Sequence, residues 1–203
     1  MAINESELAN YWVHSGMIDI NGVKMSKSLG NFITAKDILS KVDPMVLRWF
    51  LLATQYRDDV NVSDEIIESS KAELTKIITA YKQACVKLEV NDIKVDGVDE
   101  DAYKRFMDAM ADDLNTPNAY AVIFEIVKNI NQLVRVKEIN FEALGKEVNT
   151  LVRCMNVLGI VLPDMTMSLD DKKMYQEWME AKSIKDFKKA DELRTQLSQK
   201  GIL

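Results

Sequence analysis

The longest amphipathic pattern in the chain begins after Ser63 and continues to about Glu89. Its apolar side chains recur at intervals of three, four and seven residues, which is the spacing of one helix face. Two later stretches, 117–134 and 144–158, repeat this spacing, and a glycine ends the second. A shorter stretch at about 99–111 is also helical in pattern. Together these stretches predict a helical bundle.

Residues 45–55 are apolar on nearly every face, unlike the amphipathic stretches. Asp43 and Pro44 precede them as a helix cap and a first helical residue. A helix without a polar face must be buried between its neighbours. We therefore expect this helix in the interior, with Trp49 as a core residue.

Two short helical stretches, roughly 170–181 and 184–198, follow Pro163 and are predicted to form a hairpin closed by Gly201. Near the other end of the chain, Asn21-Gly22 separates two short apolar runs. An Asn-Gly pair supplies the two positive φ angles of a type I′ turn, so these runs predict a β-hairpin. This is the one strong strand signal in the sequence.

We therefore expect an all-α fold in which a short β-hairpin leads into a helical bundle and a small C-terminal helical hairpin. Residues 56–62 are expected to form a connection, and Thr116 before Pro117 is interpreted as the cap of the helix that follows. The predicted divisions are an N-terminal loop region at 1–57, the bundle at 58–162 and the C-terminal piece at 163–203.

Composition narrows the class of protein. Seven Gly and three Pro in 203 residues favour long helices. Cys85 and Cys154 are expected to be buried thiols, and without a Cys/His cluster no metal site is predicted. Asp112 and Asp113 are interpreted as helix-ending residues rather than metal ligands. We expect a reducing, cytoplasmic location and no membrane partner, because the longest apolar run is far below the roughly 18 residues that span a bilayer.

The net charge of −6 argues against a uniformly basic nucleic-acid binder, and DNA is not expected as a partner. The charge is uneven, however, because residues 58–181 carry a net −10 and residues 182–203 carry a net +3. The lysines of this last part could contact a phosphate backbone or could simply be solvated. Trp12 and Trp178 could serve as stacking platforms.

Residues 24–31, Lys-Met-Ser-Lys-Ser-Leu-Gly-Asn, form what we call the lysine loop. Two lysines, two serines and a glycine suit a mobile segment that closes over phosphates. Displacement of pyrophosphate at an α-phosphorus builds negative charge on the leaving group, which lysine ammonium groups stabilise best when water is excluded. On charge alone the loop could also be a solvated turn. The word formed by residues 24–28 would arise by composition in only about one such chain in ten thousand.

That word, KMSKS, is the signature of class I aminoacyl-tRNA synthetases, and its surroundings narrow the resemblance to cysteinyl-tRNA synthetases. The stretches that resemble this family in order and spacing are Asn10-Tyr11-Trp12 with His14 and Gly16, Lys24 to Asn31, Asp43-Pro44 with Leu47-Arg48, Tyr56-Arg57, Asp112-Asp113 with Asn115-Thr116-Pro117, and Lys185-Asp186-Phe187 with Ala190-Asp191 and Arg194. The resemblance runs essentially from one end of the chain to the other.

For the lysine loop, the resemblance implies binding of ATP, with Mg²⁺, during formation of cysteinyl-adenylate. Lys27 is the implied ATP contact, and Lys24 is the second implied catalytic lysine. The other residues implied in the ATP and pyrophosphate site are Met25, Ser26, Ser28 and Asn31, of which Asn31 is expected to steady the loop.

For the helices, the resemblance implies support of tRNA(Cys) by the bundle and recognition of its anticodon by the C-terminal piece. The matching positions are Lys182, Asp191 and Arg194. Lys182 stands where the family is expected to have arginine. Lysine keeps the positive charge but lacks the bidentate fork that suits a guanine edge.

The resemblance also implies parts that this sequence does not contain. Family members carry an N-terminal Rossmann domain with the HIGH signature, and a zinc ion bound by cysteines, a histidine and a glutamate. Glu5 is not interpreted as a zinc ligand, and His14, which has no cysteine or histidine companion, is expected to be structural. The Rossmann domain is therefore an expected partner in the complete enzyme.

The first hypothesis is thus the C-terminal, tRNA-binding portion of a cysteine–tRNA ligase, inactive by itself. A second is a stand-alone RNA-binding helical module whose lysine loop is inert. A third is part of the related ligase that joins cysteine to an amino sugar, although the sequence around Asp191 and Arg194 counts against it. The last alternative is a helical interaction domain without a ligand. Binding of tRNA separates the first two hypotheses from the others.

Overall fold

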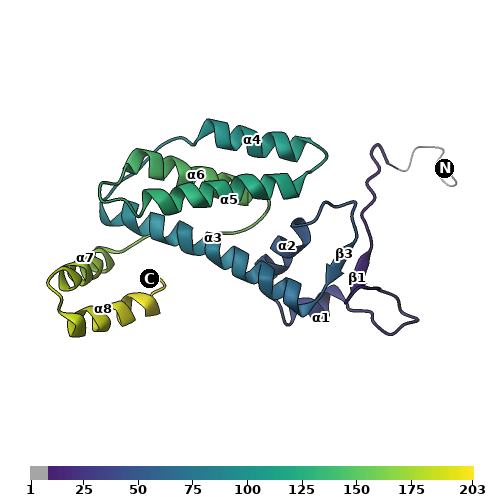
Figure 1. Ribbon diagram of the computed structural model, residues 1–203, viewed down its shortest axis with the longest axis horizontal. Coiled ribbons are helices and arrows are strands. Elements are labelled where there is room, and N and C mark those ends of the chain that lie inside the picture. The colour runs from purple at the N-terminus through teal and green to yellow at the C-terminus, as the bar shows by residue number, and fades with distance from the viewer. Residues whose placement is uncertain (1–8) are drawn as a thin grey trace.

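The computed structural model describes residues 9–203, and this part of the chain is predominantly helical (Figure 1). Its helices are α1 (Ala35–Leu39), α2 (Pro44–Leu52), α3 (Asp64–Val90), α4 (Glu100–Ala111), α5 (Thr116–Leu133), α6 (Phe141–Val157), α7 (Leu169–Ser183) and α8 (Phe187–Gln199). Its strands are β1 (Ile18–Ile20), β2 (Val23–Lys24) and β3 (Val60–Val62). The predicted fold class is confirmed. No helix in this range is long and apolar enough to cross a membrane.

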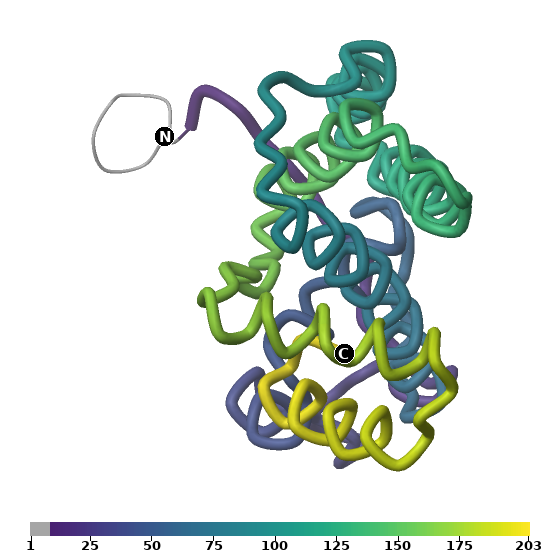
Figure 2. The backbone as a smooth tube through the Cα atoms, turned by 90° about the vertical axis from the view of Figure 1, so that its left-hand side faces the viewer, coloured from purple at the N-terminus to yellow at the C-terminus, as the bar shows by residue number. Residues whose placement is uncertain are grey.

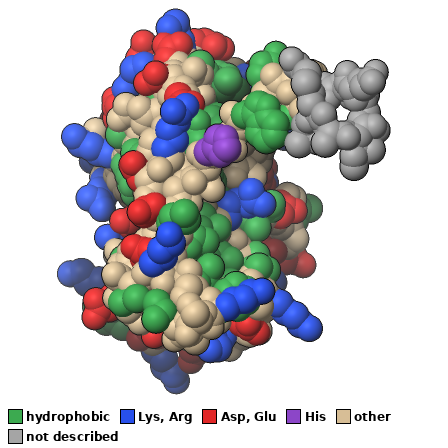
Figure 3. Space-filling model, turned by 90° about the vertical axis from the view of Figure 1, so that its right-hand side faces the viewer, with side chains coloured by type: hydrophobic (Ala, Val, Ile, Leu, Met, Phe, Trp, Pro, Cys, Tyr) green, Lys and Arg blue, Asp and Glu red, His purple; other side chains and the backbone are tan. Residues whose placement is uncertain are grey.

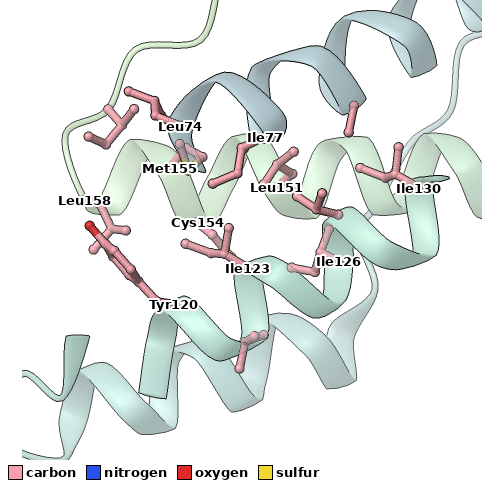
Figure 4. Close-up of a cluster of buried hydrophobic side chains, with 14 of the residues drawn as sticks. Leu74, Ile77, Tyr120, Ile123, Ile126, Ile130, Leu151, Cys154, Met155 and Leu158 are labelled. Carbon is pink, nitrogen blue, oxygen red and sulfur yellow. The ribbon is translucent and has the colours of Figure 1, made fainter. Parts of the chain in front are cut away.

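Helices α3, α5 and α6 form the centre of the bundle, and α2 and α4 pack against them. Their apolar faces meet in one core (Figure 4), where Ile77, Ile123 and Leu151 are fully buried. Each of these residues lies on the face that the helical period predicts as apolar. The bundle is therefore assembled by the pattern already visible in the sequence.

Helix α2 joins this core through Trp49, which is completely buried. The Trp49 ring stacks on the Tyr120 ring with 3.8 Å between centroids, and the Tyr120 hydroxyl donates to the Trp49 carbonyl oxygen at 2.8 Å. The Trp49 indole N–H donates to Glu73 Oε2 at 3.2 Å. Burial of α2 is less complete than predicted, because Leu51 on its outer face remains 43% exposed.

Two helix starts follow the predicted caps. The Asp43 side chain accepts hydrogen bonds at the start of α2, and the Ser63 side chain does so at the start of α3. The prediction for α5 is wrong by one residue. Asn115 caps this helix by accepting from the Asn118 N–H at 3.2 Å, whereas Thr116 is the first helical residue and is buried.

The predicted start of the last helix at residue 184 is also wrong. Helix α7 continues to Ser183, and α8 begins only at Phe187. The reason is local, because the Asp186 side chain caps α8 by accepting from the Lys189 N–H at 3.1 Å. Lys185 takes a positive φ of 61° in the turn before this cap.

The predicted β-hairpin is present, with Asn21 and Gly22 at φ +50° and +75° between β1 and β2. Strand β3 corrects the expectation of a simple connection at 56–62. It pairs with β1 in parallel, with Ile18 opposite Val60. Three residues are too few for a strand period to be visible, so only tertiary pairing defines β3.

The C-terminal hairpin of α7 and α8, which lie side by side in Figure 2, has a small core of its own against α3. The buried residues of this core are Val86, Met167, Tyr175, Leu197 and Ile202. Lys172 of α7 pairs with Asp92 at 2.6 Å and with Glu89 at 3.4 Å, both at the end of α3. The hairpin thus rests on the bundle, while the boundaries expected near residues 57 and 162 stay predictions.

Glu147 of α6 is an unusual member of the interior. Within residues 9–203, its Oε2 is the one buried side-chain polar atom without a hydrogen-bond partner, while Oε1 accepts from Asn129 Nδ2 at 2.9 Å. Burial raises the pKa of this carboxyl group above its usual value of 4.5, and the nearby Asp99 and Glu125 act in the same direction. The Asn129 hydrogen bond and Arg105 oppose this shift.

We expect Glu147→Gln to raise the free energy of unfolding at pH 7 by about 1 kcal/mol, because it removes a buried charge. The folded carboxyl group has the higher pKa, so the folded state binds more protons than the unfolded state at pH values between the unfolded pKa and this raised pKa. The unchanged protein therefore loses stability as the pH rises through this raised pKa, and the variant should not. Urea unfolding at pH 4.5 and pH 7 measures both effects. Equal stability of the two proteins at pH 7 would contradict the expectation.

Candidate lysine loop and nucleic-acid interface

The lysine loop leaves β2 and is closed at its base by Asn31. Asn31 Oδ1 accepts from the Ser26 main-chain N–H at 2.8 Å, and Asn31 Nδ2 donates to the Lys24 carbonyl oxygen at 3.1 Å. The Met25 N–H donates to the Ile18 carbonyl oxygen at 3.0 Å, which ties the start of the loop to β1. One side chain from the end of the loop therefore holds its two ends together.

The polar side chains of the lysine loop that could meet phosphate are two lysines and two serines. Lys24 and Lys27 are exposed, and none of the ion pairs within residues 9–203 involves either of them. The Ser26 and Ser28 hydroxyl oxygens lie 3.2 Å apart. The Lys27 ammonium lies 5.6 Å from the centre of the Phe32 ring. Two lysine ammonium groups without carboxylate partners and two serine hydroxyl groups are suitable donors to phosphate oxygens.

At the other end of the molecule, Lys182, Asp191 and Arg194 line one groove of about 1020 Å³. Its walls are α3, the residues that follow α5, and helices α7 and α8; we call it the hairpin groove. The structure thus brings together the three residues that the family resemblance implies for anticodon recognition. Lys182 comes from α7, and the other two come from α8.

The hairpin groove carries an excess of positive charge. The cations that line it are Lys82, Lys87, Arg135, Lys182 and Arg194. Asp191 is the one acidic side chain in the lining. This local excess contrasts with the net charge of −6 for the whole chain. A concave surface of one sign attracts a polyanion more strongly than the net charge suggests.

Besides the buried Tyr175, two aromatic side chains line the groove. The Lys182 ammonium lies 4.3 Å from the centre of the Trp178 ring, a cation–π distance that holds the lysine over the ring. Phe187, the first residue of α8, is 72% exposed and also lines the groove. An exposed aromatic ring beside cations offers a stacking surface for an unpaired base.

The sequence by itself indicated no role for Phe187. It also indicated none for the cations of the bundle wall, by which we mean Lys82, Lys87 and Arg135. Phe187 follows Lys185-Asp186 in a stretch that resembles the family. That resemblance was the one signal that could have marked Phe187 as a functional residue. Lys82, Lys87 and Arg135 had no such signal, because their spacing is that of solvated helix residues. They join the site only because the C-terminal hairpin folds back on α3.

Large apolar side chains are exposed in two stretches, one before β1 and one at the end of the lysine loop. Tyr11, Trp12 and Val13 are 89%, 65% and 70% exposed, and Leu29 and Phe32 are 64% and 46% exposed. Figure 3 shows apolar side chains beside the single histidine, His14, on this side of the molecule.

His14 is an exposed residue whose ring stacks on that of Trp12, with 6.4 Å between centroids. Within residues 9–203, no group of three or more His, Cys, Asp or Glu side chains could hold a metal ion. Glu5, which the sequence analysis does not interpret as a zinc ligand, lies outside the described residues.

Comparison with known proteins finds the same family for the N-terminal stretch with the lysine loop and for the helical bundle. The model for the tRNA synthetases class I (C) catalytic domain matches residues 1–72, and the DALR domain model matches residues 105–162. The cysteine–tRNA ligase of Leuconostoc citreum (strain KM20) is 37% identical over 96% of this chain and 43% of that protein. The chain belongs to the cysteinyl-tRNA synthetase family. The cysteine–tRNA ligase of Oceanobacillus iheyensis is 36% identical, over 100% of the chain and 45% of that protein.

The chain spans less than half the length of these cysteinyl-tRNA synthetases. It contains the end of a class I catalytic domain, in which the lysine loop lies, and a DALR domain, which is of the anticodon-binding type. Helices α5 and α6 lie within the stretch that the DALR model matches. The family uses ATP.

Proposed function

We propose that this chain is the tRNA-binding part of a cysteine–tRNA ligase and supplies its lysine loop. The complete enzyme would join cysteine to tRNA(Cys) and convert ATP to AMP and pyrophosphate. The observation that carries the proposal is the hairpin groove, where three residues predicted from the sequence lie within an excess of positive charge. The similarity to cysteine–tRNA ligases supports the same function.

The lysine loop would act in the first half of this reaction. The cysteine carboxylate would attack the α-phosphorus of ATP and displace pyrophosphate, and Mg²⁺ would supply further positive charge for the phosphates. As the bond to pyrophosphate breaks, the Lys27 ammonium stabilises the charge that grows on the leaving oxygen, and Lys24 assists it. The Ser26 and Ser28 hydroxyl groups donate to phosphate oxygens. Asn31 keeps the base of the loop closed while the tip moves over the nucleotide.

The hairpin groove would bind the anticodon arm. Arg194 and Asp191 are a donor and an acceptor for base edges, and Lys182 adds a second donor held over the Trp178 ring. Phe187 offers its exposed ring for stacking of an unpaired base. The cations on the bundle wall would contact the phosphate backbone, which positions the RNA without reading its sequence.

The exposed apolar side chains before β1 and at the end of the lysine loop would be covered by the rest of a class I catalytic domain. Tyr11, Trp12, Leu29 and Phe32 belong to the stretch that the catalytic-domain model matches. An N-terminal Rossmann domain is therefore the partner that we assign to these side chains. Without that domain the chain is not expected to activate cysteine, because a phosphate loop alone provides no nucleotide pocket.

The experiment that tests this proposal is fluorescence anisotropy of the chain with a stem–loop RNA that carries the GCA anticodon of tRNA(Cys). The same RNA with one anticodon base changed is the control, and both are titrated across a salt series. Tighter binding of the GCA form supports sequence readout. Equal, strongly salt-dependent binding of both forms favours a stand-alone RNA-binding module. No binding of either form would contradict the proposal for this chain.

We expect Arg194→Ala to weaken binding of the GCA stem–loop about tenfold and to reduce discrimination against the altered anticodon, because Arg194 is assigned to a base edge. Lys87→Ala should weaken binding of both RNAs equally, because Lys87 is assigned to the phosphate backbone. It should also lower the slope of log affinity against log salt concentration by about one. Lys188→Ala changes a lysine of α8 that does not line the groove and serves as the matched control. An equal effect of all three substitutions would contradict the assigned roles.

A further inference from the structure

Two stretches that are far apart in the sequence meet beside the bundle. Tyr56-Arg57 follows α2, and Asp113 lies in the turn between α4 and α5. The Tyr56 hydroxyl donates to Asp113 Oδ1 at 2.8 Å. Arg57 engages both carboxylate oxygens, with Nε 2.9 Å from Oδ2 and Nη2 donating to Oδ1 at 3.2 Å. We call this arrangement the Asp113 clamp.

The backbone of this turn is in a conformation that residues with a side chain rarely adopt. Asp113 and Leu114 both lie in the left-handed region, at φ 51° and 54°. The Asp113 carbonyl oxygen accepts from Gln55 Nε2 at 3.1 Å. The unusual turn therefore directs both the side chain and the main chain of Asp113 toward the segment that follows α2.

That segment is the support of the sheet that carries the lysine loop. The Gly16 N–H donates to the Tyr56 carbonyl oxygen at 2.8 Å, and the Val60 N–H donates to the Met17 carbonyl oxygen at 2.8 Å. A side chain at Gly16 would collide with the main chain of Asp58, so this close approach requires glycine. From here β1 continues into the hairpin and the lysine loop. The contacts thus run from the bundle to the base of the loop.

We propose that Asp113 is a positioning residue, which fixes the sheet and its lysine loop on the helical bundle through Tyr56 and Arg57. The Arg57 and Asp113 side chains are 64% and 49% exposed, and a simple surface pair of this exposure contributes little. The clamp differs from such a pair, because the guanidinium fork, the tyrosine hydroxyl and the glutamine amide converge on one residue. This inference does not depend on RNA binding or on the chemistry of the loop.

The test is native-state hydrogen exchange on the whole chain, followed residue by residue by NMR. We expect Asp113→Asn to accelerate exchange of the Gly16, Met25 and Val60 amides about fivefold, because asparagine tolerates the left-handed turn but cannot form the two-oxygen ion pair with the guanidinium. Exchange of amides in the bundle core, such as that of Ile126, should not change. Arg57→Gln should reproduce this pattern, and the double variant should add nothing further.

Leu114→Gly is the matched control. It removes the unfavourable φ at the neighbouring position and leaves the Asp113 carboxylate in place, so the sheet amides should exchange no faster than in the unchanged protein. Unchanged exchange of the sheet amides in Asp113→Asn would overturn the proposal. So would an equal acceleration in the sheet and the bundle core, because that result would assign Asp113 to overall stability rather than to positioning.

Discussion

Trp49→Ala is expected to lower the free energy of unfolding by about 4 kcal/mol, the largest stability effect that we predict for a single substitution. Trp49 is completely buried, so its removal leaves a large cavity between α2, α3 and α5. It also removes the stack on Tyr120 and the indole donor that Glu73 accepts from. Urea unfolding followed by far-UV circular dichroism measures the loss without relying on tryptophan fluorescence.

Two milder variants show which contact matters. Trp49→Phe keeps a ring for Tyr120 but removes the indole N–H, and it should cost clearly less than the alanine variant. Tyr120→Phe keeps the stack and removes only the hydroxyl that donates to the Trp49 carbonyl oxygen, so a loss of about 1 kcal/mol is expected. A loss below about 1 kcal/mol for Trp49→Ala would mean that α2 contributes little to the core.

Lys27→Ala is expected to slow cysteine-dependent pyrophosphate exchange about 100-fold in a complete ligase that contains this chain. The proposed reason is that the Lys27 ammonium stabilises charge that appears only as pyrophosphate leaves. The affinity for cysteine should be nearly unchanged, because no lysine of the loop is assigned to the amino acid. Steady-state exchange rates at varied ATP and cysteine concentrations separate these two effects.

Lys36→Ala is the matched control, because Lys36 is an exposed lysine of α1 outside the loop. Lys27→Arg keeps the charge with a different donor geometry and should retain more activity than the alanine variant. An unaltered exchange rate in Lys27→Ala would remove the role that we assign to this residue. A matching loss in Lys36→Ala would point to a general effect of charge instead.

The helical architecture and much of the candidate chemistry could be predicted from the sequence for local reasons. The period of α3, α5 and α6 marks the faces that are buried, and the Asp43 and Ser63 caps mark two helix starts. The lysine loop was recognisable because its residues are contiguous. Lys182, Asp191 and Arg194 were found through family resemblance, since lysines, arginines and aspartates at such spacing are common on solvated helices.

The parts that could not be predicted depend on contacts between distant segments. Strand β3 is defined by pairing with β1, about 40 residues earlier in the chain, and not by a period of its own. The Asp113 clamp joins residues 56 positions apart, and their carboxylate and guanidinium groups look like ordinary surface charges in the sequence. The cations Lys82 and Arg135 reach the hairpin groove only through the packing of α7 on α3.

The sequence by itself therefore determined the helices, the β-hairpin and the identity of the lysine loop, because each is encoded by residues that lie within a few turns of one another. Only the tertiary structure decided where the positive charge collects and what holds the loop to the bundle. The physical reason is the distance along the chain over which each kind of interaction acts. Helix period, capping and turn chemistry act over a few residues, whereas a groove or a clamp exists only when segments far apart along the chain are brought into contact.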